Sequence, residues 1–253
     1  MRKTFAAGVV LAGVLALAGT VSAQAPMSAD QLIARHVAAR GGLDKLRAIR
    51  SLHFEGDMLV DFGGGAVKLD VNETLARGGK MRQDATIQGL TIVQAYDGAH
   101  GWQIQPFSGR KDAEALSPDD SKDLAEQADI DSALVDYKAK GSSVEYLGTE
   151  DMDGTPAYKL RVTEKSGDQL TFFIDTDSLM TIRVLTKRSL HGHDQMSIND
   201  LGDYELIDGV YFPFQIEQSQ PGSTQKTTIS FDKGEANGSA DDALFAMPKT
   251  PAK

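Results

Sequence analysis

The feature of this sequence that most constrains its fold is a strict alternation of apolar and polar residues. The alternation recurs along most of the chain, over residues 52–62, 67–71, 81–87, 90–92, 158–162, 170–174, 180–184, 210–216 and 229–231. A period of two indicates β-strands with one buried and one solvated face, which is typical of antiparallel sheets. We therefore expect a mainly β protein, with a few helices, built on one antiparallel sheet.

Turn residues separate these segments and keep the links between them short. They include Gly63-Gly64-Gly65, Gly78-Gly79, Asp97-Gly98, Asp153-Gly154 and Asp208-Gly209. Short links join strands that are neighbours in an antiparallel sheet, so the pattern predicts an up-and-down meander. We expect a curved sheet of about ten or eleven strands, because open sheets of this size begin to curl.

A helical pattern precedes the first strand. Ser28 has the position of an N-cap, and Gln31 three residues later completes a capping box. Apolar residues then recur at helical spacing until Gly41-Gly42, which is a typical helix end. A second short helix is expected over residues 43–49.

A second helical pattern interrupts the strands in the middle of the chain. Ser117 is expected to cap it, with Pro118 at the first helical position. The segment lies between two sets of strands, so it can fold back across the sheet. Composition shows no linker, and we expect one domain over residues 24–253.

The first 23 residues have the features of a cleaved signal peptide. Arg2 and Lys3 provide a positive start, residues 5–19 are apolar, and small residues at 21–23 suit cleavage after Ala23. The apolar stretch is shorter than the roughly 20 residues that span a bilayer. We expect an exported protein that is not an integral membrane protein.

Composition excludes several classes of function. The chain has 36 acidic and 26 basic residues, with a formal net charge of −10, which argues against nucleic acid as a partner. It has no cysteine, so disulfides, thiolate metal sites and a cysteine nucleophile are excluded.

The broad apolar face of the predicted sheet must be covered, and the sequence offers few helices for this purpose. Two alternatives remain open: helix side chains fill the space, or an apolar cavity remains that holds lipid or acyl chains. Trp102 has both readings, as a core anchor or as a cavity wall. The candidate cavity residues are Phe54, Met58, Val60, Leu69, Val71, Trp102, Ile104, Phe107, Phe172, Ile174, Phe212 and Phe214.

Several short motifs, in order, resemble those of LolA-like outer-membrane lipoprotein-sorting proteins. They are residues 41–46 (GGLDKL), 96–98 (YDG), 101–102 (GW), 106–109 (PFSG), 153–160 (DGTPAYKL), 208–209 (DG), 212–214 (FPF) and 244–248 (LFAMP). The chain is similar to the broader branch of that family rather than to its dedicated carrier. The resemblance implies a half-barrel sheet, helices on its concave side and a periplasmic carrier or chaperone for acyl chains of lipoproteins or membrane lipids. It also implies an alternative, a sensor or scaffold that binds a periplasmic or outer-membrane protein.

The sequence gives little support for a catalytic or metal-binding site. His191 and His193 are the best metal candidates, but no third ligand is identifiable and Gly192 favours a solvated bend. The acidic residues over 119–131 lack the glycine of a calcium loop. Residues 63–68 do not continue as a phosphate-binding loop. We therefore expect no catalytic residues, no metal and no cofactor.

Overall fold

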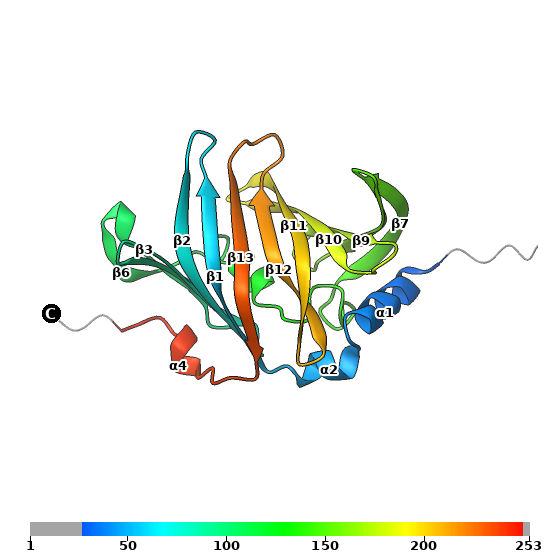
Figure 1. Cartoon of the computed structure of the whole chain (residues 1–253), viewed down its shortest axis with the longest axis horizontal. Coiled ribbons are helices and arrows are strands. Elements are labelled where there is room, and N and C mark those ends of the chain that lie inside the picture. Colours follow the sequence, from blue (N-terminus) through cyan, green and yellow to red (C-terminus); the bar gives the residue numbers. More distant parts are fainter. Residues whose placement is uncertain (1–26, 250–253) are drawn as a thin grey trace, which may run out of the picture.

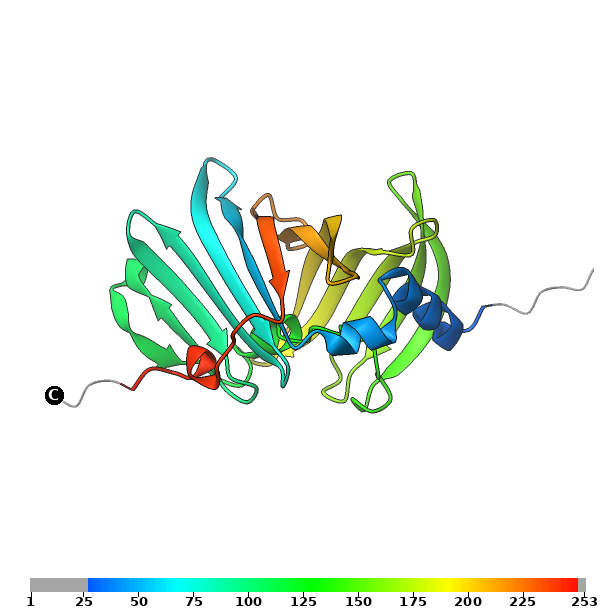
Figure 2. The same cartoon turned by 60° about the horizontal axis from the view of Figure 1, so that its bottom comes forward.

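The computed structural model of the chain describes residues 27–249, so the predicted signal peptide lies outside the described residues. The described residues form one sheet of thirteen strands. The sheet is open and strongly curved (Figures 1 and 2). Within residues 27–249, no helix is long and apolar enough to cross a membrane.

All neighbouring strands of the sheet are antiparallel, as the alternation predicts. In chain order they are β1 Ser51–Asp61, β2 Ala66–Ala76, β3 Lys80–Ile87, β4 Leu90–Tyr96, β5 Gly101–Gln105, β6 Arg110–Ala115, β7 Ser143–Met152, β8 Thr155–Thr163, β9 Gln169–Asp175, β10 Thr181–Leu190, β11 His193–Ile207, β12 Val210–Ser219 and β13 Lys226–Ala236. A 3-10 turn over Pro106–Ser108 links β5 to β6.

The sheet consists of two meanders joined along their first and last strands. Strands β1 to β6 follow one another in space, and so do β7 to β13, while β1 pairs with β13. Strands β6 and β7 are therefore the two opposite edges. The segment that connects them, residues 116–142, must cross the sheet, and we call it the insert.

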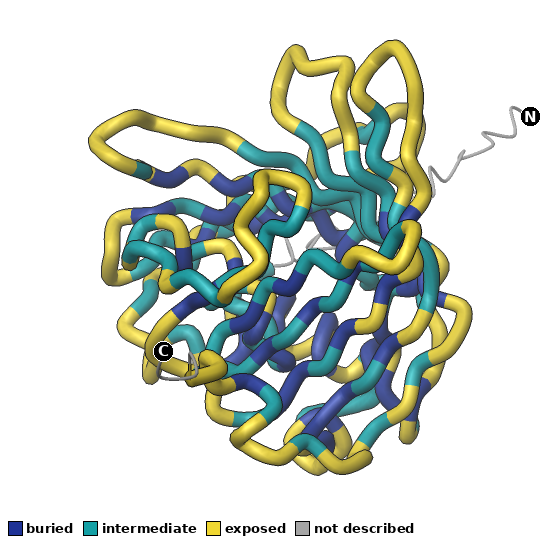
Figure 3. The backbone as a smooth tube through the Cα atoms, turned by 90° about the vertical axis from the view of Figure 1, so that its left-hand side faces the viewer, coloured by how far each residue is buried: buried dark blue, intermediate teal, exposed yellow. Residues whose placement is uncertain are grey.

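The insert crosses the apolar face of the sheet. Its Leu124, Ile130 and Leu134 belong to the same buried cluster as Phe54 of β1 and Phe172 of β9. We call the face that carries these two phenylalanines the inner face. Buried positions concentrate along the strands, whereas the hairpin tips are exposed (Figure 3).

The helix start predicted in the insert needs correction. Helix α3 spans Lys122–Gln127 and begins after Ser121, not at Pro118. The hydroxyl of Ser117 accepts a hydrogen bond from the Asp120 amide at 3.1 Å, so this serine closes a turn ahead of the helix. Most of the remaining insert consists of turns.

The N-terminal helices agree with the sequence patterns. Helix α1 spans Ala29–Ala39, and the capping box of Ser28 and Gln31 is present. Helix α2 spans Leu43–Ala48. Both bury apolar residues in the inner-face cluster. A fourth helix, α4 over Asp242–Phe245, lies at the other end of the sheet (Figure 1).

The predicted number of strands was too low. The nine alternating segments do not include β5, β6, β7 and β11; β5 has only five residues, and the other three carry little apolar alternation. Strands β6 and β7 are edges, and most of β11 is exposed or half-buried. A strand without a dry face has no period-two signal to detect.

Candidate ligand-binding cavity

A cavity lies between the inner face of the sheet and the insert. Its volume is about 240 Å³. The insert contributes Ile130 and Ala133 to its wall, and the sheet contributes most of the large apolar side chains, namely Leu52, Phe54, Leu75, Leu170, Phe172, Val184, Leu201, Phe212, Ile216, Ile229 and Phe231. A wall of this composition suits a hydrocarbon guest.

An aromatic cluster forms one part of this wall. The rings of Phe54 and Phe231 are stacked with centroids 4.6 Å apart. Phe214 meets both rings edge-on, at 5.9 Å from Phe54 and 6.4 Å from Phe231. Phe212 lies 6.5 Å from Phe54, also edge-on. These four residues come from three adjacent strands, so the cluster is fixed by the register of β1, β13 and β12.

A polar group interrupts the apolar wall near the end of α1. His36 is 2% exposed, and its Nδ1 donates to the Leu179 carbonyl at 2.8 Å. Burial, with the nearby charge of Arg40, lowers the pKa of His36 to about 4, so the ring is neutral near pH 7. The hydroxyl of Tyr204 donates to the Thr181 carbonyl at 2.7 Å, and burial raises the pKa of this tyrosine.

A buried carboxyl group, Glu73, also lines the cavity. It interrupts the apolar face of β2, where its neighbours on that face are Val71 and Leu75. The Gln83 amide donates to Glu73 Oε2 at 2.8 Å. Burial raises the pKa of Glu73, because desolvation penalises the carboxylate.

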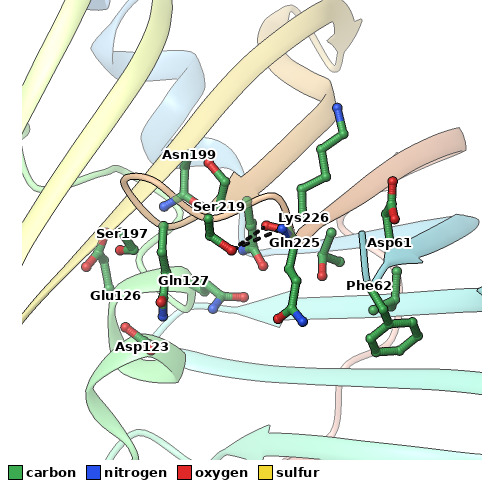
Figure 4. Close-up of a pocket in the computed structure, with 15 residues that line it drawn as sticks. Asp61, Phe62, Asp123, Glu126, Gln127, Ser197, Asn199, Ser219, Gln225 and Lys226 are labelled. Carbon is green, nitrogen blue, oxygen red and sulfur yellow. Dashed lines mark hydrogen bonds between the residues drawn. The ribbon is translucent and has the colours of Figure 1, made fainter. Parts of the chain in front are cut away.

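A second hollow of about 350 Å³ opens beside the cavity, and most of the residues that line it are polar (Figure 4). We call it the outer groove. Its wall includes Val60 and Phe62 of the β1 hairpin. The outer groove adjoins the cavity, because four residues line both spaces: Glu126, Gln127, Asn199 and Gln218. The site is thus apolar inside and polar at its mouth.

Ion pairs fasten the insert beside this mouth. The Arg188 guanidinium of β10 is 6% exposed and pairs with Asp123 and Glu126 of α3. Burial raises the pKa of Glu126, and the Arg188 charge opposes this shift. Lys122 donates to the Ser189 carbonyl at 2.8 Å. Polar contacts therefore hold α3 against the sheet at its rim.

A further ion pair fastens the middle of the insert. Arg77, which follows β2, pairs with Asp131. The same guanidinium donates to the carbonyls of Ile49 at 2.7 Å and Leu46 at 2.6 Å. One arginine thus ties the insert, the end of α2 and the end of β2 together.

The structure places most of the predicted cavity residues on the inner face. Phe54, Phe172 and Phe212 line the cavity. Met58, Val71, Ile174 and Phe214 pack in the surrounding apolar cluster, Leu69 is buried on the same face of β2, and Val60 lines the outer groove.

The other three predicted residues, Trp102, Ile104 and Phe107, lie away from the inner face. Cross-strand pairing runs from His53 through Thr74, Arg82 and Ala95 to Trp102, whereas Phe54 belongs to the neighbouring row. Adjacent residues of a strand face opposite sides. Trp102 and Ile104 therefore lie on the outer face, and Phe107 lies in the turn after β5 and is 55% exposed.

Trp102 instead anchors the C-terminal helix to the outer face. It is 1% exposed and packs in a small separate cluster with Val93 and Ala95. Its Nε1 donates to the Phe245 carbonyl at 2.7 Å. Of the two readings of this residue, the core anchor fits the structure.

The sequence analysis missed the polar residues of the cavity. Glu73 left a detectable signal, because it is the one acidic residue in an alternating apolar row on β2. Arg40 and Tyr204 left none. They approach the cavity through a helix end and through a half-buried strand, neither of which follows a simple pattern.

The candidate metal ligands lie at a hairpin turn. His191 and Gly192 link β10 to β11, and both are exposed. The His191 Nε2 lies 2.8 Å from an Asp120 carboxylate oxygen of the insert. In the part of the chain that the structure describes, no three His, Asp or Glu side chains are grouped so that they could hold a metal ion.

The fold and the cavity define a class of proteins with an open antiparallel sheet around an apolar hollow. Solved structures with the same fold match the chain over most of its length. A DUF1329 family protein from Desulfovibrio piger is 17% identical, with a TM-score of 0.59, over 86% of this chain and 95% of the other.

Two further matches bear on the motifs discussed above. A domain assigned to outer-membrane lipoprotein-sorting proteins, from Vibrio parahaemolyticus, is 9% identical, with a TM-score of 0.59, and covers 86% of this chain and 95% of its own. A LolA superfamily protein from Nitrosomonas europaea is 13% identical, with a TM-score of 0.58. The match covers 87% of this chain and 98% of that protein. The LolA-like resemblance is thereby confirmed at the level of the fold.

Sequence comparisons add no closer relationship. No protein-family profile matches the chain. No curated protein matches it significantly. At the low identities of the structural matches, the likeness establishes the fold and leaves the function to be argued from the site.

Proposed function

We propose that this chain is a non-enzymatic periplasmic carrier or chaperone that shelters acyl chains of lipoproteins or membrane lipids. The proposal combines the sequence features of an exported protein with the fold and the cavity. Its function would be to keep hydrocarbon out of water during transport to the outer membrane.

The observation that carries the proposal is the apolar cavity beneath the insert. Its wall combines an aromatic cluster with aliphatic residues from several strands. Transfer of hydrocarbon from water to such a wall contributes roughly 0.8 kcal/mol for each buried CH₂ group. The polar outer groove gives the guest a path to solvent.

The insert is built so that it can move without disrupting the sheet. It contains only one short helix, and ion pairs and buried apolar side chains, rather than strand pairing, fasten it to the sheet. Opening it would enlarge the cavity for a longer chain. The thirteen strands keep their hydrogen bonds in such a motion, because none of them pairs with the insert.

Dye binding tests the proposal directly. N-phenyl-1-naphthylamine is neutral and apolar, and its fluorescence rises on entering a hydrocarbon environment. We expect the purified protein to bind the dye, and native mass spectrometry to show copurified lipid. Protein that is free of lipid and does not bind the dye would refute the carrier function.

A pair of alanine variants locates the binding. Ala133 lines the cavity, so Ala133→Phe should fill it and weaken dye binding about tenfold. Ala115 lies exposed at the end of edge strand β6, so Ala115→Phe should leave binding unchanged. Equal effects of the two substitutions would place the dye outside the cavity.

A second candidate function, a sensor or scaffold for a protein partner, is favoured by the acidic outer side of β1, with Glu55, Asp57 and Asp61, and by the two edges of the sheet. Within the described residues, the outer sides of β6 and β7 have no neighbouring strand, and such edges can accept a strand from a partner. A pull-down that is lost on charge reversal at Glu55, Asp57 and Asp61, with dye binding intact, would support this candidate. No response of the pull-down would count against it.

A further inference from the structure

One cation in the cavity wall, Arg40, has no anionic partner among residues 27–249. It follows the last residue of α1 and is 7% exposed. Its guanidinium carbon lies 5.6 Å from the centroid of the Phe212 ring. The side chain therefore brings a positive charge to an otherwise largely apolar cavity.

The hydrogen bonds of Arg40 use only part of its capacity. Nε donates to the Tyr211 carbonyl at 3.5 Å and Nη1 to the Asp131 carbonyl at 3.4 Å, which are long for hydrogen bonds. A guanidinium has five N–H donors. Among the described residues, Nη2 has no hydrogen-bond acceptor.

The acidic side chains whose charges act on Arg40 are already paired with other cations. Asp131 pairs with Arg77, and Asp129 pairs with Lys140 at 2.5 Å. Over residues 27–249, no carboxylate forms an ion pair with Arg40. Because an arginine keeps its charge in proteins, burying it without an anion is costly. A ligand that supplies the anion would remove this cost.

We propose that Arg40 binds the anionic headgroup of a single-chain amphiphile whose hydrocarbon tail lies in the cavity. The headgroup is a carboxylate or a phosphate, which the planar guanidinium can bind through two parallel hydrogen bonds. The inference rests on the proposed function, since it presupposes that the cavity holds a hydrocarbon chain. It goes further by naming the chemistry of the guest.

The surroundings of Arg40 suit this guest. The adjacent His36 ring is neutral, and Tyr204, whose hydroxyl donates its proton to the Thr181 carbonyl, also lines the cavity. The cavity volume of about 240 Å³ is below the range of about 300–1,000 Å³ usual for drug-sized ligands, so it fits one chain rather than several.

Three probes with the same tail isolate the headgroup. Dodecanoate, dodecyl phosphate and dodecan-1-ol are each used to displace N-phenyl-1-naphthylamine from the wild-type protein. We expect both anions, or one of them, to displace the dye at concentrations roughly 10- to 100-fold lower than the alcohol. A ratio of this size is what one charge-assisted hydrogen bond usually adds to binding affinity. The better of the two anions distinguishes a fatty-acid carboxylate from a lipid phosphate.

Variants of Arg40 assign the preference to this residue. Arg40→Met should abolish the preference for anions and leave displacement by the alcohol within about twofold of wild type. Arg183→Met is the matched control, because Arg183 pairs with Asp200 and does not line the cavity. This control should keep the preference of the wild type.

The outcomes separate the two proposals. If the dye does not bind, the carrier function fails. If the dye binds but the alcohol competes as well as the anions, Arg40 does not bind a headgroup and the carrier function stands. The comparison of the three probes on the wild-type protein decides whether a headgroup is bound, even where Arg40→Met fails to fold. A preference that persists in Arg40→Met or in Arg40→Gln also overturns the assignment.

Discussion

The burial of His36 leads to a specific prediction about stability in mild acid. Burial lowers the pKa of this histidine from 6.5 to about 4. The folded chain therefore binds fewer protons than the unfolded chain between these two values, so acid favours unfolding. The contribution of His36 to stability is intact above about pH 6.5, falls as the pH is lowered, and is lost once the pH reaches about 4.

The two pKa values set the magnitude of the effect. Each pH unit between them corresponds to about 1.36 kcal/mol. Integrating the linkage relation from pH 7 to pH 5 gives a loss of about 2 kcal/mol in the free energy of unfolding. This is a large part of the roughly 5–15 kcal/mol typical of a folded domain.

The assay compares the wild type with His36→Gln, which carries no titrating group at this position. Urea unfolding is measured between about pH 7 and pH 5, by far-UV circular dichroism and by the fluorescence of Trp102, the one tryptophan of the chain. Carboxylates titrate in both proteins, so the difference between them isolates His36. The stability of the wild type relative to the variant should fall by about 2 kcal/mol over this interval.

A control removes a histidine that is not buried. The His100 side chain is 86% exposed, so His100→Gln should leave the pH dependence unchanged. Parallel pH profiles for wild type and His36→Gln would show that His36 is not held neutral by burial, and would refute the reasoning.

Three further predictions follow from contacts described above. Arg188→Met leaves the half-buried Glu126 without its partner, so the free energy of unfolding in urea should fall by about 3 kcal/mol. Because the insert is then held less firmly, dye exchange should be faster. Gly234→Ala places a Cβ 2.5 Å from Ile207, and should lower the free energy of unfolding by about 1–3 kcal/mol, whereas Gly238→Ala, with nothing within 4 Å, should not. Trp102→Phe leaves a buried carbonyl unpaired and should cost about 1–3 kcal/mol by circular dichroism, with dye binding unchanged, since Trp102 lies on the outer face. Weakened dye binding in Trp102→Phe would contradict the assignment of faces.

The sequence predicts the central strands well because one face of each strand is solvent-exposed and the other is buried. In β2 and β12, for example, buried residues alternate with exposed ones over most of the length. The edge strands β6 and β7 have no comparable contrast. Their position depends on hydrogen bonding to one neighbour, which leaves little trace in the order of apolar residues.

The cavity was predictable in composition and only in part by residue. Alternation shows that Trp102 and Ile104 share a face, but it does not show which face of the whole sheet that is. The answer depends on the pairing register across β1 to β5. Arg40 was beyond such reasoning, because its importance comes from the three-dimensional structure, in which no carboxylate of the described residues pairs with it.

The insert explains how a cavity persists where a longer helix would fill the space. It buries Leu124, Ile130, Leu134 and Val135 in the inner-face cluster and still leaves a cavity of about 240 Å³, while ion pairs such as that of Arg188 hold α3 at the rim. Ligand binding and the fastening of the insert should therefore stabilise the same closed state. A ligand at about 100 times its Kd contributes about 2.7 kcal/mol, close to the loss of about 3 kcal/mol expected for Arg188→Met.

Loading should thus offset the loss of the ion pair. We expect Arg188→Met saturated with ligand to unfold in urea near the midpoint of the ligand-free wild type. Trp102→Phe serves as the comparison, since its defect lies on the outer face, away from the cavity. If the ligand stabilises neither protein, it does not bind in the closed cavity, and the insert is not what retains it.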